Sequence, residues 1–254
     1  MSNQHLNYSE MAKDQPPDLG YKCTKCKDKG YTLSKDESGY EYSEECECAL
    51  LEKANHLLKQ SGLEKMVHDS NFSTFRYDYV WQGQMFSKAQ EYLFDNKKGN
   101  WFFIGGKVGA GKTHLCTAIC YEFIKGCMRT IYMPYREAFS VLKRMLSANA
   151  RDEFDHYLQS LKTTEVLYID DLFKCEKGKL PTSWEIEMIY EIIDSRYRNS
   201  ELKTIISSEL NINQVLEIDE AIGSRIYERS KFYNIILSEQ TCSNIRLNPL
   251  KVQK

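Results

Sequence analysis

The sequence predicts an α/β fold in which helices flank a parallel sheet, preceded by a small domain that carries cysteines. From about residue 82 onward, short apolar runs alternate with segments of helical periodicity, as in parallel strands joined by helical crossovers. Upstream, residues 21–51 hold four of the nine cysteines in a polar context. We therefore expect a cysteine-bearing domain over residues 1–62, a linker over 63–81 and an α/β domain over 82–254.

The composition is that of an ordinary globular protein. Of the 254 residues, 42% are hydrophobic and 28% are charged, and no apolar run approaches the ~20 residues that span a membrane. The first twenty residues are polar and lack the apolar segment of a secretory signal. We expect a cytoplasmic protein without a membrane partner, in which the cysteines are reduced.

Charge is distributed unevenly along the chain. Residues 1–62 contain eight lysines, no arginine and eleven acids, whereas the remainder has 26 basic and 25 acidic residues. Affinity for nucleic acid depends on neutralising phosphates, for which arginine is especially well shaped. The acidic front segment is therefore expected to bind a protein rather than DNA.

The expected elements follow one another along the chain. Apolar residues at helical spacing predict a helix over 48–62, with Gly62 as its stop. A polar and aromatic connector covers 68–82. Strands are expected at 100–106, 129–135, 164–173, 203–210 and 233–239. Helices are expected at 112–126, 137–148, 152–161 and 183–200, with a further helical stretch before the last strand.

A complete phosphate-binding motif joins the first of these strands to the next helix. It fits G-x-x-x-x-G-K-[ST] and consists of Gly106, Lys107, Val108, Gly109, Ala110, Gly111, Lys112 and Thr113. The glycines let backbone N–H groups point at phosphate oxygens, and the helix adds the positive end of its dipole. Lys112 is expected to reach the β- and γ-phosphates, and the Thr113 hydroxyl to ligate Mg²⁺. The sequence thus predicts a site for ATP or ADP with Mg²⁺ rather than a chance glycine-rich turn.

Two adjacent acids end the expected strand at 164–173. In P-loop enzymes the first such acid, here Asp170, holds the Mg²⁺ shell, and the second, here Asp171, often polarises the attacking water. The pair could instead cap a helix, but the complete phosphate loop upstream favours the metal-binding interpretation. The sequence carries no sign of the acceptor pocket that a kinase needs, so hydrolysis is favoured.

The order of these motifs resembles the AAA+ helicase loaders of the DnaC/DnaI type, many of which are encoded by phages or prophages. The resemblance covers essentially the whole chain and rests on the stretches GGKVGAGKTHL, VLYIDDLF, IIDSRY, KTIISSEL, IGSRIYERS and NIRL. It implies an ATPase that depends on self-association, binds a DnaB-type hexameric replicative helicase and grips single-stranded DNA. Because the sequence stops at Lys254, we expect no full helical lid.

The resemblance also implies roles for single residues. Arg225 lies where the family carries an arginine finger that reaches a neighbouring subunit's nucleotide, and Arg246 where it carries a second nucleotide-sensing arginine. Either could instead be an ordinary surface residue. The family's polar sensor, commonly asparagine, is replaced by Glu209, which accepts but cannot donate a hydrogen bond when ionised. Either the adjacent Ser208 contributes, or the site senses nucleotide differently.

The resemblance further implies that the helical insertion after the second strand contacts single-stranded DNA. Lys143 and Arg144 are the basic residues there that we would test first. Two adjacent basic residues on a helix are, however, more often a solvated face.

The front cysteines have the pattern of a zinc site. Cys23 and Cys26 form a Cys-x-x-Cys pair, and Cys46 and Cys48 follow after a segment that suits a β-hairpin. A redox role fits poorly without a thioredoxin-like unit, and His56 could replace one ligand. The remaining cysteines are expected to be packing residues: Cys116, Cys120, Cys127, Cys175 and Cys242. In loaders of the DnaI type, a zinc domain of this kind docks on the helicase.

Three functions remain open at this point. The leading hypothesis is an ATP-dependent loader that binds the hexameric replicative helicase and helps place it on single-stranded DNA during replication initiation. A transposition helper ATPase of the IstB type shares the ATPase core but typically begins differently. The third alternative is a zinc-bearing adaptor in which nucleotide acts only as a conformational switch.

Overall fold

The computed structural model describes residues 20–95, 97–238, 242, 244 and 245, and the chain divides into two compact units after Glu52. We describe the units separately, because their relative placement is not determined. The functional boundaries expected at residues 62 and 81 remain a prediction. Among the helices of the described residues, none combines the length and the apolar character needed to cross a bilayer.

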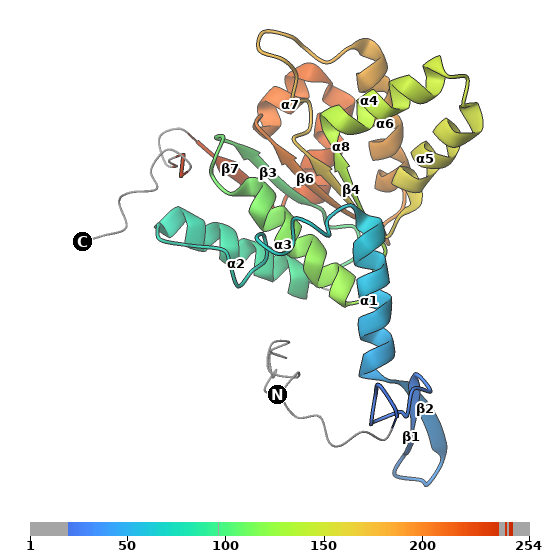
Figure 1. Ribbon diagram of the computed structural model, residues 1–254. Helices are drawn as coiled ribbons and strands as arrows, with labels where there is room; N and C mark the ends of the chain where they lie inside the picture. The colour runs from blue at the N-terminus through green and yellow to red at the C-terminus, as the bar shows by residue number, and fades with distance from the viewer. Residues whose placement is uncertain (1–19, 96, 239–241, 243, 246–254) are drawn as a thin grey trace. The chain divides into compact units, whose positions relative to one another are not determined.

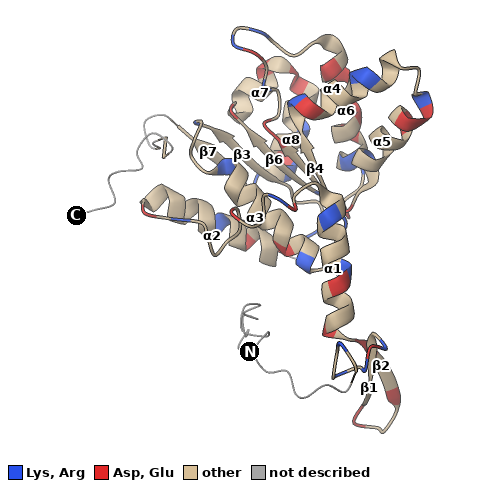
Figure 2. Cartoon of the chain, viewed as in Figure 1, with Lys and Arg blue, Asp and Glu red and all other residues tan. Residues whose placement is uncertain are grey.

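The first unit contains an antiparallel hairpin, as the sequence predicts. Its strands are β1 (Tyr31–Lys35) and β2 (Glu41–Glu45). The turn is closed by the Asp36 carboxylate, which accepts hydrogen bonds from two backbone N–H groups of the loop. All of β2 is exposed, and its acidic side chains give this hairpin the negative character expected of the front segment (Figure 2).

Helix α1 (Glu47–Ser61) confirms the helix expected at 48–62. It ends before Gly62, whose φ of +82° is readily adopted only without a Cβ. The segment after it was expected to be a linker. Within the second unit, Leu63, Val67 and Phe75 of this segment are buried in one hydrophobic cluster with Leu115. The sequence does not predict this packing, because the three apolar residues are isolated and follow neither a helical nor a strand period.

The second unit is built on a five-stranded sheet in which every neighbouring pair is parallel (Figure 1). Its spatial order is β4 (Thr130–Pro134), β5 (Val166–Asp170), β6 (Lys203–Ser208), β3 (Phe102–Gly106) and β7 (Asn234–Leu237). All five expected strands are thus confirmed. The sheet places the carboxyl ends of β3, β5 and β6 side by side, which is where the predicted site residues follow.

Helices cover both faces of this sheet (Figure 1). One face carries α2 (Val80–Phe94) and α3 (Lys112–Lys125). The other carries α4 (Tyr135–Ser147), α5 (Arg151–Thr163), α6 (Ser183–Tyr197), α7 (Ile212–Ile218) and α8 (Glu220–Ser230). Helix α2 had not been predicted as a separate element. Past β7, the described residues 238, 242, 244 and 245 form no helix.

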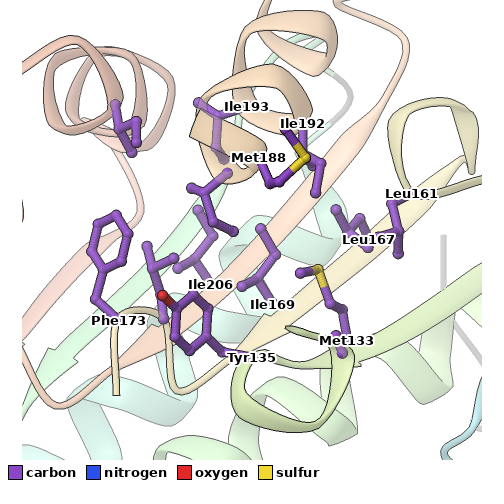
Figure 3. Close-up of a cluster of buried hydrophobic side chains, with 14 of the residues drawn as sticks. Met133, Tyr135, Leu161, Leu167, Ile169, Phe173, Met188, Ile192, Ile193 and Ile206 are labelled. Atoms are coloured by element: carbon purple, nitrogen blue, oxygen red, sulfur yellow. The ribbon is translucent and has the colours of Figure 1, made fainter. Parts of the chain in front are cut away.

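Alternate side chains of each strand belong to the two hydrophobic clusters on opposite faces of the sheet. In β5, Leu167 and Ile169 pack under α5 and α6, whereas Val166 and Tyr168 point to the α3 side. Figure 3 shows the first cluster, in which Ile192 and Ile193 of α6 lie over the sheet. Because both faces are covered, the strands are apolar almost throughout, up to the aspartates at the end of β5.

A buried arginine joins three elements in the second unit. Arg196 of α6 is fully buried and donates to the carbonyls of Leu161, Thr164 and Lys203 and to the Thr204 hydroxyl, at 2.6–3.0 Å. Burial lowers the pKa of its guanidinium to about 9, so the group is charged at neutral pH. These bonds fix the end of α5 and the start of β6 to α6.

We expect Arg196→Met to lower the free energy of unfolding by about 3–5 kcal/mol, because it leaves several buried acceptors without a donor. Denaturant titration of the full chain measures this loss. The matched control is Arg198→Met, also at the end of α6, whose side chain is 75% exposed. It should cost under about 1 kcal/mol. Equal losses in the two variants would contradict the role given to Arg196.

Candidate functional site

The phosphate loop has the backbone conformation that its glycines permit. Gly106, Gly109 and Gly111 have φ values of +107°, +74° and +87°. A Cβ on Gly106 would collide with the Leu237 carbonyl of the neighbouring strand, and one on Gly109 with the Asn244 side chain. The loop therefore approaches other backbone closely and runs directly into α3. Ala110 is buried and Val108 exposed, with Lys107 between these extremes.

Lys112 is held against its own loop. It is 6% exposed, and its Nζ donates to the carbonyls of Gly106 at 2.7 Å and Lys107 at 2.8 Å. Burial lowers the pKa of this lysine, and the nearby carboxylates of Asp171 and Glu209 act in the opposite direction. Two loop carbonyls therefore accept the Lys112 hydrogen bonds that a phosphate oxygen could also accept.

The structure brings Thr113 and Asp170 together, as the motifs predict. The Thr113 hydroxyl donates to Asp170 Oδ1 at 3.2 Å. Three further hydroxyls reach this carboxylate: Tyr168 at 2.6 Å, Ser207 at 2.5 Å and Tyr132 at 2.9 Å. Sequence reasoning missed these three: Tyr168 lies on β5 itself, and Tyr132 and Ser207 lie on the neighbouring strands β4 and β6. The arrangement fixes a buried acid beside the phosphate loop, in position to share a cation with Thr113.

Asp171 and Glu209 face the same cavity and share one cation. Lys174 Nζ lies 2.7 Å from Asp171 Oδ2 and 2.7 Å from Glu209 Oε1. Asp171 has a φ of +56°, and its backbone N–H donates to the Ser207 hydroxyl. The Ser208 hydroxyl is buried and donates to the Leu172 carbonyl, so it supports the loop rather than facing the cavity. Lys174 is a fourth residue of the site that the motifs did not indicate.

These groups line one cavity of about 310 Å³. The lining comprises Ser70, Val108, Gly109, Gly111, Lys112, Thr113, His114, Asp171, Lys174, Glu209 and Ile245. A larger hollow of about 640 Å³ beside α2 contains none of the motif residues. Convergence of a phosphate loop, carboxylates and ammonium groups marks the smaller cavity as the candidate site for a nucleotide.

The expected linker forms part of this site. The His114 ring Nε2 lies 3.0 Å from the Asn71 carbonyl oxygen and 3.3 Å from the Thr74 hydroxyl. The Phe75 ring meets the His114 ring edge-on at 5.1 Å and lies close to Gly111. Residues 70–75 therefore cover the start of α3, which could not be foreseen from a segment without a motif.

Arg225 lies elsewhere in the second unit. Its Nε and Nη2 lie 3.1 and 3.0 Å from Asp194 Oδ1, and Nη1 donates to the Ala221 carbonyl. The rings of Tyr190 and Tyr197 flank the guanidinium at 5.2 and 5.5 Å. The side chain is 24% exposed and does not line the nucleotide cavity. Arg246, expected as a second nucleotide-sensing residue, lies outside the described residues.

The two basic residues singled out on α4 differ in their surroundings. Lys143 pairs with Glu185 at 2.7 Å and lies over the Trp184 ring. Arg144 lines a hollow of about 370 Å³ next to it. Lys143 thus has a protein partner, and its proposed DNA contact would have to compete with Glu185.

The four front cysteines converge in the first unit. Their sulfur atoms all lie within 4.8 Å of one another, with Cys23–Cys46 at 3.8 Å and Cys26–Cys48 at 3.4 Å. Tetrahedral Zn–S bonds of about 2.3 Å place sulfurs about 3.8 Å apart, so the set fits a zinc ion. Bonding to the Cys26 backbone N–H lowers the pKa of Cys23 to about 7, which favours the thiolate.

The chain turns directly after the first two ligands. Lys27 and Asp28 have φ values of +52° and +61°, and the Lys27 N–H donates to the Cys23 carbonyl. His56 is not part of the sulfur cluster, and its ring Nε2 lies 2.9 Å from Gln60. The four cysteines form a complete set of ligands without His56. Of the other cysteines, Cys116, Cys120 and Cys242 are buried, whereas Cys127 and Cys175 are partly exposed.

Comparisons with known proteins agree with this arrangement. The model of the family "IstB-like ATP binding protein" matches residues 43–238. The phage-like element PBSX protein XkdC of Bacillus subtilis is 34% identical over 226 residues, which are 85% of this chain and 82% of that protein. The replicative helicase loader DnaC of Escherichia coli is 25% identical over 194 residues, covering 73% of this chain and 75% of that protein.

A solved structure supports the fold. The crystal structure of the DnaC helicase loader matches 67% of this chain and 96% of its own length, with a TM-score of 0.54 and 22% identity. This likeness confirms the predicted fold of a parallel sheet flanked by helices.

We expect the purified full chain to contain one zinc ion, and Cys26→Ser to lose it, because three sulfurs leave the tetrahedral site open. Metal analysis by mass spectrometry measures the ratio of zinc to protein. The matched control is Cys127→Ser, which changes a cysteine outside the cluster and should retain a full equivalent. A full equivalent of zinc in the Cys26→Ser variant would contradict the assignment.

Proposed function

The chain belongs to the family of IstB-like ATP binding proteins, and from that premise we propose that it is an ATP-dependent loader of a hexameric replicative DNA helicase. The observation that carries this proposal is one cavity that joins a complete phosphate loop to the acids at the end of β5. The cysteine unit in front and the sequence relationship to a replicative helicase loader support it further. A protein of this function would act in the cytoplasm on single-stranded DNA.

The site residues have distinct parts in the proposed ATP hydrolysis. The backbone N–H groups of the loop and Lys112 bind the phosphates, and Lys112 exchanges its bonds to the loop carbonyls for phosphate oxygens. Thr113 and Asp170 would hold Mg²⁺, which neutralises phosphate charge. Asp171, at the family's catalytic carboxylate position, would act as the general base that accepts a proton from the attacking water.

The geometry of Arg225 supports a dependence on assembly. Within one subunit the guanidinium is bound to Asp194 and does not line the cavity. On the proposed function, Arg225 reaches the nucleotide of a neighbouring copy and stabilises charge that develops in the transition state. The chain would then hydrolyse ATP efficiently only when several copies associate, as in an assembly around a hexameric helicase. The second arginine of this role would be Arg246.

We further propose that the cysteine unit docks on the helicase. The exposed hairpin is acidic and lacks arginine, and four thiolates around Zn²⁺ would add about two negative charges. Such a surface repels DNA and suits a basic patch on a protein.

A second function is favoured by the name of the matching family. A transposition helper of the IstB type would use the same ATPase core, and the family model covers most of it. The cysteine cluster distinguishes the two hypotheses, because a helper of this type would not need a zinc-dependent complex with the replicative helicase. A zinc-bearing adaptor without turnover is distinguished by the ATPase measurement below.

We expect Asp171→Asn to abolish most ATP turnover, with a loss of about a hundredfold or more, because the amide cannot accept a proton from water. Phosphate release is measured for the full chain with and without single-stranded DNA and helicase. Asp78→Asn, which changes an exposed acid outside the cavity, is the matched control and should turn over ATP normally. If the unaltered chain shows no turnover under any of these conditions, the enzyme assignment fails and the adaptor remains.

The docking proposal has its own test. The full chain should capture the replicative helicase of its host in a pull-down, and a zinc chelator or Cys26→Ser should reduce this capture at least tenfold. Cys127→Ser should capture it normally. A complex that is indifferent to both chelation and Cys26→Ser would contradict the role given to the cysteine unit, and the absence of any complex with the helicase would favour the transposition helper.

A further inference from the structure

The Lys174 ammonium occupies an unusual position between two carboxylates of the nucleotide cavity. Its Nζ lies 2.7 Å from Asp171 Oδ2 and 2.7 Å from Glu209 Oε1, and its side chain is 35% exposed. Partial burial lowers the pKa of Lys174, but the hydrogen bonds to Asp171 and Glu209 outweigh it and raise the pKa above its ordinary value. Lys174 is therefore charged throughout the physiological range.

The loop that carries Lys174 is fastened to β6. The Leu172 N–H donates to the Ser207 carbonyl, and the Ser208 hydroxyl donates back to the Leu172 carbonyl at 2.7 Å. The Lys174 N–H closes a turn onto the Asp171 carbonyl at 3.0 Å. These bonds fix the start of the lysine side chain, so its ammonium is positioned by the fold rather than by chance on a mobile surface.

The hydrogen-bonding capacity of the cavity singles out this ammonium. An ammonium has three N–H bonds, and those of Lys174 to Asp171 and Glu209 use two of them. Glu209, as a carboxylate, can only accept. Between these two carboxylates, a bound anion would therefore find its donor in Lys174.

Charge leads to the same conclusion. Asp170, Asp171 and Glu209 contribute three negative charges around the site, and Lys112 and Lys174 contribute two positive ones. A triphosphate approaching this site needs both ammonium groups, because each carboxylate without a cation beside it repels the phosphates. Lys112 comes from the loop that binds the phosphates along their length. Lys174 adjoins Asp171, the acid proposed to meet the attacking water, and so lies on the side of the terminal phosphate.

We propose that Lys174 is a second phosphate-binding lysine of this site, oriented by Glu209, which distinguishes ATP from ADP by contacting the terminal phosphate. The inference rests on the proposed ATPase function. Glu209 cannot donate a hydrogen bond to the phosphate itself. In this inference it positions the Lys174 ammonium, which donates instead.

The test compares nucleotide affinities of the full chain by calorimetry in the presence of Mg²⁺. Lys174→Met should weaken the binding of a non-hydrolysable ATP analogue about tenfold to a hundredfold, the effect of losing one charge-assisted hydrogen bond. Its affinity for ADP should change less than about twofold, because ADP lacks the terminal phosphate. Lys179→Met, which removes a lysine that is 70% exposed and paired with Glu176, is the matched control and should leave both affinities unchanged.

A double variant distinguishes a contact between Lys174 and the terminal phosphate from simple neutralisation of Glu209 by Lys174. If Lys174 only neutralised Glu209, Lys174→Met with Glu209→Gln would restore affinity for the analogue; if Lys174 contacts the phosphate, the double variant stays weak. Lys174→Gln, which keeps a donor without the charge, should fall between Met and the unaltered chain and serves if the Met variant does not fold.

Each possible outcome of these binding measurements either supports or overturns the inference about Lys174. Equal losses for both nucleotides, an unchanged or tightened affinity for the analogue, or restoration in the double variant would overturn the inference alone. An unaltered chain that binds neither nucleotide would overturn the proposed function together with it.

Discussion

The Asp170 carboxylate is the constraint on which the site depends. It is 7% exposed, and within the described part of the chain its hydrogen-bond partners are the hydroxyls of Thr113, Tyr132, Tyr168 and Ser207. A buried ion is costly unless it is fully hydrogen-bonded. These four hydroxyls come from α3, β4, β5 and β6. The buried charge is therefore tolerated only when the strands are in this register and α3 begins at this place beside them.

The two cations of the cavity are satisfied differently, and this difference suits their roles. Lys112 bonds to loop carbonyls, which are neutral acceptors and yield readily to a phosphate. Lys174 bonds to the carboxylates of Asp171 and Glu209, which compete more strongly, so it can remain in place while its third N–H binds a ligand. Both ammonium groups thus have protein partners and keep the capacity to bind an anion.

Much of this site could be predicted from the sequence, because the phosphate loop, the paired aspartates and the cysteine spacings are local patterns that one backbone geometry explains. The partners of Asp170 could not, because a hydroxyl on β4 is recognisable only once the strand order is known. The same holds for Arg196, whose acceptors lie on α5 and β6. The segment 63–81 was interpreted as a linker because its buried Leu63 and Phe75 follow no period.

The contact between Arg225 and Asp194 bears on how the proposed ATPase avoids wasteful turnover. The two side chains are 24% and 15% exposed, so the pair is partly screened and worth on the order of 1 kcal/mol. A desolvated arginine–phosphate contact is stronger. Release of Arg225 from Asp194 is therefore unfavourable in an isolated subunit and becomes favourable only when a neighbour presents a bound triphosphate. The stacking of the guanidinium between Tyr190 and Tyr197 keeps its side chain ordered, which reduces the entropy lost on docking. On the proposed function, an arginine held in this way would make hydrolysis conditional on both assembly and nucleotide.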